Sequence, residues 1–278
     1  MTRIRIATLV AVLATGLFLM GCGAQESATW HDAPVAAEPA GLAGGTAGGE
    51  PISTPPSGSP SPSTSSSPSS NVSTPPDGIL KNTGSQTEVS LTFDDGPDPS
   101  YTPKILELLR NNGAKATFCL VGVQVQQFPD LVRQIVAEGH TLCNHTWKHD
   151  LKLGTRGEQA IRADLQRTND AILAAVPGAQ IKYFRHPGGM WTPTAIKVAQ
   201  AMGMTCAGWE VDTDDWNVAK YPAGEHMKQH VLSTLRNSVK PGSIVLAHDA
   251  GGDRRGTMAA YEIALPELKS KYQLVGLP

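Results

Sequence analysis

Several features that mark other classes of protein are missing from this sequence of 278 residues. Neither sign of charge dominates, because 23 Lys and Arg face 25 Asp and Glu, which gives a formal net charge of −2. This balance excludes the strongly basic surface of a typical nucleic-acid-binding protein. The sequence also lacks a glycine-rich phosphate-binding loop and a dinucleotide-binding fingerprint. We therefore expect no nucleic-acid partner and no nucleotide cofactor.

Cysteine is scarce as well, with only four residues, and no two of them form a Cys-x-x-Cys pair. Zinc binding by cysteine thiolates is therefore not expected. A long apolar run occurs near the N-terminus, from Ile6 to Met20, and it follows Arg3 and Arg5. With about fifteen residues, this run is too short to span a membrane comfortably. A signal peptide explains it better than a membrane helix.

The end of this apolar run is similar to a bacterial lipoprotein cleavage site, since the small residue Gly21 precedes Cys22. We expect residues 1–22 to be a signal peptide and Cys22 to carry the lipid. The protein would then be exported and anchored to a membrane at the bacterial cell envelope. A plain secretory signal is the alternative, because Met20 is uncommon in such a site, and it would give a secreted protein.

Residues 23–86 show no pattern of a packed core. Between Pro51 and Asp77 the chain consists mostly of Pro, Ser and Thr, which bury too little apolar surface to offset the entropy of ordering. This composition predicts a disordered tether that its prolines keep extended. Residues 87–278 instead alternate between apolar and amphipathic segments, and they are numerous enough for one domain with a single sizeable core.

Seven strands alternate with six helices in this predicted domain, which indicates parallel βαβ units. The expected strands are Val89 to Phe93, Ala116 to Val121, His140 to Cys143, Ile181 to Phe184, Thr205 to Trp209, Ser243 to Ala247 and Gln273 to Gly276. Helix starts are indicated by Thr102-Pro103, by Thr155 with Glu158 as a capping box, and by Thr192-Pro193. Helix ends are indicated by Gly113, Gly139 and Gly203.

The chemically suggestive side chains all follow the carboxyl ends of expected strands. They are Asp94, Asp95, His145, His149, Arg185, Asp212, His248 and Asp249. A β/α barrel builds its active site at this end of its strands, so this placement favours a barrel over an open doubly wound sheet with the same alternation. Such a barrel would place Cys119 beside Cys143, either as a disulfide or as two buried thiols.

Asp94 and Asp95 are followed about fifty residues later by His145 and His149. One carboxylate and two imidazoles provide three ligands for a tetrahedral divalent metal and leave a fourth position for water, while the second carboxylate could act as a base. Either motif alone would be weak evidence, since an Asp-Asp pair is usually a solvated turn. Because the pair directly follows a strand pattern, the combination indicates metal-assisted hydrolysis.

Five segments resemble, in order, the five motifs of the NodB-type polysaccharide deacetylases, carbohydrate esterase family 4. They are residues 92–97, 145–149, 184–189, 212–216 and 244–249. The resemblance implies an α/β fold, a distorted (β/α)7 barrel, that removes acetyl groups from amino sugars or xylan with one divalent metal ion, commonly zinc. It also implies that Asp95, His145 and His149 hold the metal and that Asp94 is the base.

The resemblance assigns further roles around this pair of aspartates. His248 would be the acid that protonates the leaving nitrogen, and Asp212 would pair with His248 and stabilise its charged form. Arg185 would orient Asp94 and keep it ionised. Together these residues predict a bell-shaped pH profile.

Gly188 stands where many members of the family have Tyr. Its backbone N–H would still stabilise the oxyanion, but an aromatic wall of the site is missing. Trp191 or His186 could fill the space, or both could be ordinary loop residues. Trp216 and Leu246 would shape the pocket for the acetyl methyl group.

A lipid anchor and a long tether would hold the domain near the cell wall. We therefore expect a monomer that deacetylates an acetylated polysaccharide, most economically N-acetylglucosamine in peptidoglycan. A chitooligosaccharide or xylan deacetylase would carry nearly the same motifs. The alternative of another class is a noncatalytic protein that binds wall glycans, and it is disfavoured because such a protein would not require both Asp94 and His248.

Overall fold

The computed structural model describes residues 77–278. The expected signal peptide, with the lipidation site Cys22, lies outside these residues, as does most of the expected tether. Across the described part of the chain, no helix combines the length and the apolar character that crossing a membrane requires.

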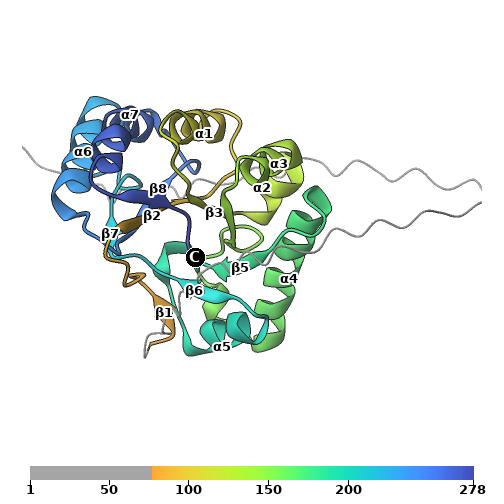
Figure 1. Ribbon diagram of the computed structural model, residues 1–278. Helices are drawn as coiled ribbons and strands as arrows, with labels where there is room; N and C mark the ends of the chain where they lie inside the picture. The colour runs from red at the N-terminus through yellow and green to blue at the C-terminus, as the bar shows by residue number, and fades with distance from the viewer. Residues whose placement is uncertain (1–76) are drawn as a thin grey trace, which may run out of the picture. The chain divides into compact units, whose positions relative to one another are not determined.

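The described domain is built on one curved sheet of parallel strands with helices packed around it (Figure 1). Its strands are β1 Ile79–Leu80, β2 Glu88–Asp94, β3 Thr117–Leu120, β4 Thr141–Asn144, β5 Ile181–Phe184, β6 Thr205–Ala207, β7 Val211–Asp212, β8 Ile244–His248 and β9 Gln273–Val275. Hydrogen-bonded neighbours follow the order β1-β6-β5-β4-β3-β2-β8-β7, and β9 pairs with β2. Among these strands β7 does not pair with β6 or β1, so the barrel is incomplete there. This is the distorted barrel of parallel strands that the sequence predicts.

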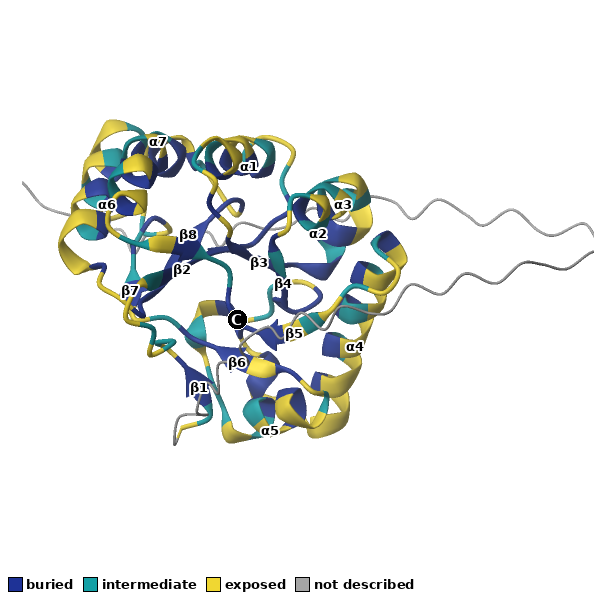
Figure 2. Cartoon of the chain, viewed as in Figure 1, coloured by how far each residue is buried: buried dark blue, intermediate teal, exposed yellow. Residues whose placement is uncertain are grey.

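The helices that cover the sheet each bury one face. They are α1 Thr102–Asn111, α2 Gly122–Gln127, α3 Pro129–Ala137, α4 Glu158–Ala175, α5 Pro193–Ala201, α6 Glu225–Ser238 and α7 Arg255–Lys269, with short 3-10 turns at Leu153–Thr155 and Pro187–Gly189. Figure 2 shows buried residues on the inward side of the helices and exposed residues outside. In α1 the buried positions Thr102, Ile105, Leu106 and Leu109 follow the helical spacing of three and four residues.

The helix boundaries test the capping predictions. Thr192 caps α5, because its hydroxyl accepts the Ala195 N–H at 3.1 Å. The three expected stop glycines all have positive φ after α1, α3 and α5. The capping box at Thr155 is wrong, since Gly157 is the N-cap of α4 and the Thr155 hydroxyl donates to the Lys152 carbonyl instead.

The domain starts earlier than the sequence predicts. Ile79 and Leu80 are buried and pair as β1 with Cys206 and Ala207 of β6, although they fall in the segment expected to be tether. The start expected at residue 87 is therefore too late. A strand of two residues has no detectable period, and its partner lies far away in the sequence, so local pattern could not reveal it. The same reason explains why β7 was missed.

The largest buried cluster lies between the strands and the helices α1 to α4, α6 and α7, and Phe93 packs there against Phe118 and Tyr261. Of the two possibilities for the cysteines, the structure shows the disulfide: Cys119 and Cys143 are opposite one another in the β3–β4 register and are bonded. Cys206 is free and buried, and it belongs to a smaller core cluster with Phe184 and Met204.

The strand register brings the ends of five strands to one edge. Asp94 of β2 is aligned with His248 of β8, and Asn144 of β4 is aligned with Leu120 of β3 and Phe184 of β5. The residues that follow these ends, among them His145 and Arg185, therefore emerge together. Parallel strands place their carboxyl ends on the same side, so this edge is where side chains distant in sequence meet.

Candidate active site

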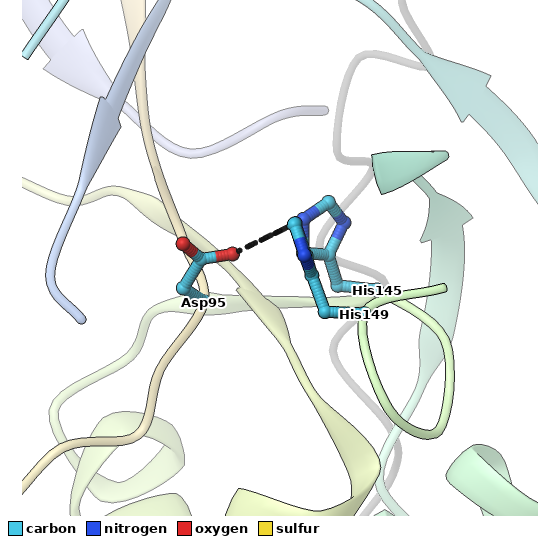
Figure 3. Close-up of side chains that lie close together, drawn as sticks. All are labelled: Asp95, His145 and His149. Atoms are coloured by element: carbon cyan, nitrogen blue, oxygen red, sulfur yellow. Dashed lines mark ion pairs between the residues drawn. The ribbon is translucent and has the colours of Figure 1, made fainter. Parts of the chain in front are cut away.

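Asp95, His145 and His149 converge at this edge (Figure 3). One ligand atom from each lies within 4.8 Å of the others. The Oδ1 atom of Asp95 is 3.5 Å from Nε2 of His145 and 3.2 Å from Nε2 of His149. These separations are close to the edge, about 3.4 Å, of a tetrahedron whose bonds to zinc are about 2.0–2.1 Å.

The donor atoms of this cluster suit a divalent cation. The Nδ1 of His145 bonds to the carbonyl of Arg185 at 2.8 Å, which leaves the Nε2 lone pair directed at the cluster. Burial lowers the pKa of His149 and so favours the neutral, metal-binding imidazole. Asp95 Oδ1 is buried without a hydrogen-bond partner. An unpaired buried oxygen is costly unless a cation or another group satisfies it, so the three residues fit a metal site.

The backbone at and beside these ligands adopts a conformation that residues other than glycine rarely take. Asp95, Thr146 and His149 all have positive φ, between 55° and 78°. Such strain concentrates at functional sites, where the surrounding structure maintains it. Asn144 supplies part of that support, because its Oδ1 accepts the N–H of Thr146 at 2.9 Å and its amide donates to the Leu165 carbonyl at 2.8 Å. Sequence reasoning missed this role of Asn144.

Arg185 holds Asp94, as expected. Its Nη1 is 2.7 Å from Asp94 Oδ1, and the guanidinium is fully buried. The same Nη1 donates to the Thr92 hydroxyl, and Nε and Nη2 donate to the carbonyls of Ala207 and Gly208. The Oδ2 of Asp94 lies 3.6 Å from Nε2 of His145. One carboxylate oxygen is therefore fixed by the arginine, and the other faces the metal-ligand cluster.

His248 pairs with Asp215, and the expected pairing with Asp212 is wrong. The Nδ1 of His248 lies 2.6 Å from Asp215 Oδ1, and its backbone N–H donates to Asp215 Oδ2 at 3.0 Å. The Thr257 hydroxyl donates to the same Oδ2 at 2.9 Å. Burial lowers the pKa of His248, but the Asp215 carboxylate outweighs this effect and raises the pKa to about 9. His248 is thereby kept as an imidazolium, the form that can donate a proton.

Asp212 has a different position. It ends β7, is half-buried and lines the cavity at the site, while its Oδ1 accepts the N–H of Asp214 at 2.8 Å. Burial raises its pKa. The chain turns between the two acids, with positive φ at Asp214, and this turn rather than the strand directs Asp215 at His248. Motif spacing alone does not show which of two acids three residues apart points inward.

Two further buried residues, Arg254 and Asp249, support the segments that form the site. Sequence reasoning gave neither of them a role. Arg254 donates to the carbonyls of Ala250 and Asp215 at 2.6 and 2.5 Å, so it ties the loop after His248 to the segment that carries Asp215. Asp249 accepts the Thr102 hydroxyl at 2.5 Å. A Cβ on Gly96 would lie 2.6 Å from Asp249 Oδ2, which explains why glycine follows the acidic pair.

A cavity of about 650 Å³ opens above these groups. Asp94, Asp95, His149 and His248 line it, as do the expected residues Gly188, Trp216 and Leu246. Trp191 is not among its lining residues and packs against Phe184 and His186 instead. His186 reaches the cavity but is fully buried and bonded to two loops. Trp191 therefore does not supply the missing wall beside Gly188, and His186 is a structural residue of the loops.

The site combines a candidate metal centre with a candidate base and acid. One carboxylate and two imidazoles lie at the carboxyl edge of a parallel barrel, and beside them are a carboxylate held by an arginine and a buried imidazolium. This arrangement is that of a hydrolase. The family model for polysaccharide deacetylases matches residues 81–207. A peptidoglycan-N-acetylglucosamine deacetylase of Bacillus cereus is 38% identical over 185 residues, which cover 66% of this chain and 82% of that relative. The chain belongs to the polysaccharide deacetylase family, carbohydrate esterase family 4.

Other relatives are named for different substrates. A chitooligosaccharide deacetylase of Sinorhizobium fredii is 35% identical over 161 residues, covering 58% of this chain and 71% of the relative. Among solved structures, the peptidoglycan N-acetylglucosamine deacetylase Bc1960 is similar with a TM-score of 0.65 and 33% identity, covering 72% of this chain and 90% of the other. Membership therefore indicates a hydrolase that deacetylates polysaccharides, while the relatives differ in the sugar polymer they are named for.

One structural neighbour is described as a pseudoenzyme of the same family. This Bacillus anthracis protein, BA3943, is 30% identical with a TM-score of 0.61, and the match covers 69% of this chain and 63% of that one. Because the family contains such a member, the arrangement of the site residues matters as much as the overall likeness. In the present chain the candidate base, the acid and two of the three metal ligands line one cavity, and the third ligand and the two counter-ions contact these residues.

Proposed function

We propose that this protein is a metal-dependent deacetylase of N-acetylglucosamine in bacterial cell-wall peptidoglycan. The observation that carries the proposal is the pairing of Asp94 with Arg185 and of His248 with Asp215 beside the Asp95, His145 and His149 cluster. A held carboxylate and a held imidazolium are the base and the acid that amide hydrolysis requires. A protein that only binds glycans would have no need for either pair.

Asp94 acts first, as the base. Its Oδ2 accepts a proton from the attacking water, while Arg185 keeps Oδ1 fixed. A divalent cation held by Asp95, His145 and His149, most commonly zinc in this family, would supply Lewis-acid polarisation and lower the pKa of water. The backbone N–H of Gly188, at the cavity wall, stabilises the negative charge that develops on the acetyl oxygen.

His248 completes the reaction as the acid. The water oxygen bonds to the acetyl carbon, the carbon–nitrogen bond breaks, and the proton from His248 goes to the departing sugar nitrogen. The products are acetate and a free amino sugar. Proton donation is needed because an amide anion is a very poor leaving group, and Asp215 keeps His248 protonated at neutral pH. Trp216 and Leu246, which line the cavity, would enclose the acetyl methyl group.

The substrate and the location form the finer part of the proposal. Two Bacillus cereus relatives are named peptidoglycan-N-acetylglucosamine deacetylases, and a lipid on Cys22 followed by a long Pro, Ser and Thr tether would hold the domain at the wall. The protein would act there as an exported, monomeric lipoprotein. Deacetylation of chitooligosaccharides is the second candidate, because several relatives are named for it.

The test is acetate release by the full-length protein from three substrates: peptidoglycan, chitin oligomers and acetylated xylan. We expect release from peptidoglycan to be fastest, to stop with a chelator, to return with added zinc, and to be absent in Asp94→Asn. Faster release from chitin oligomers would select the second candidate. Binding of peptidoglycan without acetate release, and without any difference between wild type and Asp94→Asn, would instead establish a noncatalytic glycan-binding protein.

A further inference from the structure

Large apolar side chains gather at the opening of the cavity. Of the five that are exposed among the described residues, Leu151, Met190 and Trp216 line the cavity, with exposed fractions of 51%, 58% and 49%. Hereafter these three residues are called the rim. Exposed apolar side chains that cluster around one cavity indicate contact with a ligand, whereas scattered ones need no explanation. Leu151 and Met190 belong to none of the assigned catalytic or metal-binding residues.

Leu151 is held in place by the turn that follows His149. The Asp150 carboxylate accepts the Lys152 N–H at 2.9 Å and forms an ion pair with Arg156 at 2.5 Å. The N–H of Leu153 donates to the Asp150 carbonyl at 3.1 Å. The half-exposed position of Leu151 is therefore part of a bonded turn and does not result from a loose loop.

His186 joins this turn to the loop that carries Met190. Its Nε2 accepts the Gly154 N–H at 3.0 Å, and its Nδ1 bonds to the Pro187 carbonyl at 3.0 Å. The ring is fully buried, and burial lowers its pKa, which favours the neutral form that this pattern requires. Leu151 and Met190 thus lie on two loops that are locked together, as a preorganised contact surface requires.

Leu151 also covers Gly188. A Cβ at this position would lie 2.9 Å from Cδ2 of Leu151, and Gly188 has a φ of 59°, where side chains are strained. The absence of a side chain at Gly188 leaves the space that Leu151 occupies. The aliphatic side chains of Leu151 and Met190, from the loops after β4 and β5, therefore lie beside the proposed oxyanion donor, while Trp209 lies against the neighbouring Gly189.

We propose that Leu151 and Met190 determine specificity for a glycan chain by packing against the apolar face of the sugar ring next to the acetylated one. This inference rests on the proposed function, because the scissile acetamide is placed at the catalytic residues. The cavity suits a pyranose ring chemically: the rim offers apolar surfaces for C–H faces, and Asp212 and Lys152 also line the cavity and offer polar partners for hydroxyl groups.

The experiment compares a β-1,4-linked N-acetylglucosamine tetrasaccharide with the N-acetylglucosamine monosaccharide, using full-length Leu151→Ala, Met190→Ala and the double variant. We expect KM for the tetrasaccharide to rise about fivefold in each single variant, because part of an aliphatic side chain loses its buried contact. The kcat should stay within about twofold, since no group that touches the reacting atoms changes. Activity on the monosaccharide should be unchanged. Leu173→Ala, on α4 and 38% exposed, is the matched control.

Tetrasaccharide binding measured by calorimetry in the Asp94→Asn background separates this proposal from the proposed function. If wild type releases no acetate but Leu151→Ala weakens binding and Leu173→Ala does not, the rim proposal stands and the catalytic one fails. If wild type is active but Leu151→Ala and Met190→Ala leave KM and binding unchanged, the rim proposal is wrong. Equal losses on monosaccharide and tetrasaccharide would also overturn it, because they would indicate damage to the acetyl pocket or the fold.

Discussion

The floor and the rim of the cavity are built in opposite ways. The floor consists of ionisable side chains that are mostly buried, namely Asp94, Asp95, His145, His149 and His248. Asp94 and His248 have buried counter-ions, and His145 is oriented by a backbone carbonyl. The rim, formed by Leu151, Met190 and Trp216, is apolar and about half exposed.

The two regions also obtain their order differently. Floor residues end β2 and β8 or follow the ends of β2 and β4, so the register of the sheet positions them. A buried charge also tolerates little displacement from its partner. Rim residues lie on connecting loops. The sequences of such loops can differ between related proteins without disturbing the sheet. The difference suggests that the floor sets the chemistry and the rim sets the choice of glycan, and the predictions below test that separation.

The largest effect is expected from the metal ligands. His149→Ala should lower kcat/KM by roughly 10³-fold on every acetylated substrate, because several kcal/mol of charge stabilisation would be lost. Removal of metal from the wild type with a chelator should have the same effect. Zinc titration followed by calorimetry should show weaker binding by the variant. Tight zinc binding by His149→Ala would mean that the metal lies elsewhere.

A smaller loss is expected when the support of the base is altered. Arg185→Lys should reduce kcat by about 10²-fold on all substrates, because lysine cannot reproduce the bonds to Asp94, Thr92 and two carbonyls and the base would be misplaced. Steady-state kinetics would measure the loss, with a thermal melt to show that the protein folds. Arg236→Lys, which alters an exposed pair with Glu267, is the control. A rise in KM alone would assign Arg185 to substrate binding.

Asp215 and Asp212 belong to one motif but have different positions. Asp215 supports the floor residue His248, whereas Asp212 lines the cavity. Asp215→Asn removes the charge that raises the pKa of His248, so that pKa should fall. Because His248 acts in its protonated form, the basic limb of the kcat profile should move to lower pH, by roughly 1–2 units. Asp212→Asn should move this limb much less. A larger displacement in Asp212→Asn would restore the assignment that the structure contradicts.

A weaker effect is expected at the rim. Trp216→Ala should lower kcat/KM for peptidoglycan and chitin oligomers by roughly tenfold, since the lost contact is that of a half-buried aromatic side chain. Substrate-saturation curves should place most of the change in KM. A loss as large as that of His149→Ala would break the proposed separation, because it would place Trp216 among the residues that perform the chemistry.

The smallest effect on activity is expected from the disulfide. Replacing Cys119 and Cys143 by alanine should lower the free energy of unfolding by about 2–4 kcal/mol, because the bond closes a loop between residues 24 apart. At low temperature kcat should change less than twofold. Urea denaturation and acetate release would measure the two quantities. Unchanged stability would show that packing of β3 on β4 suffices, whereas a large loss of kcat would link the bond to the position of His145.

Much of the fold and the site could be predicted because the signals are local. The apolar runs of β2 to β5 and β8 stand out, the glycines after α1, α3 and α5 end their helices, and Asp94, Asp95, His145 and His149 occur in compact motifs directly after strands. What could not be predicted depends on contacts between distant residues. The two-residue strand β1 pairs with β6, and the brace from His186 to Gly154 connects two loops.

The amino-acid sequence by itself determined which side chains are available for catalysis and at which ends of which strands they stand, because strand pattern and motif are properties of neighbouring residues. Only the tertiary structure decided that Asp215 rather than Asp212 pairs with His248, and that Leu151 covers Gly188. Both outcomes depend on the direction of a turn, namely the positive φ at Asp214 and the bonded turn after His149. The direction of a side chain after a turn follows from packing and hydrogen bonds with other segments, which spacing along the chain does not encode.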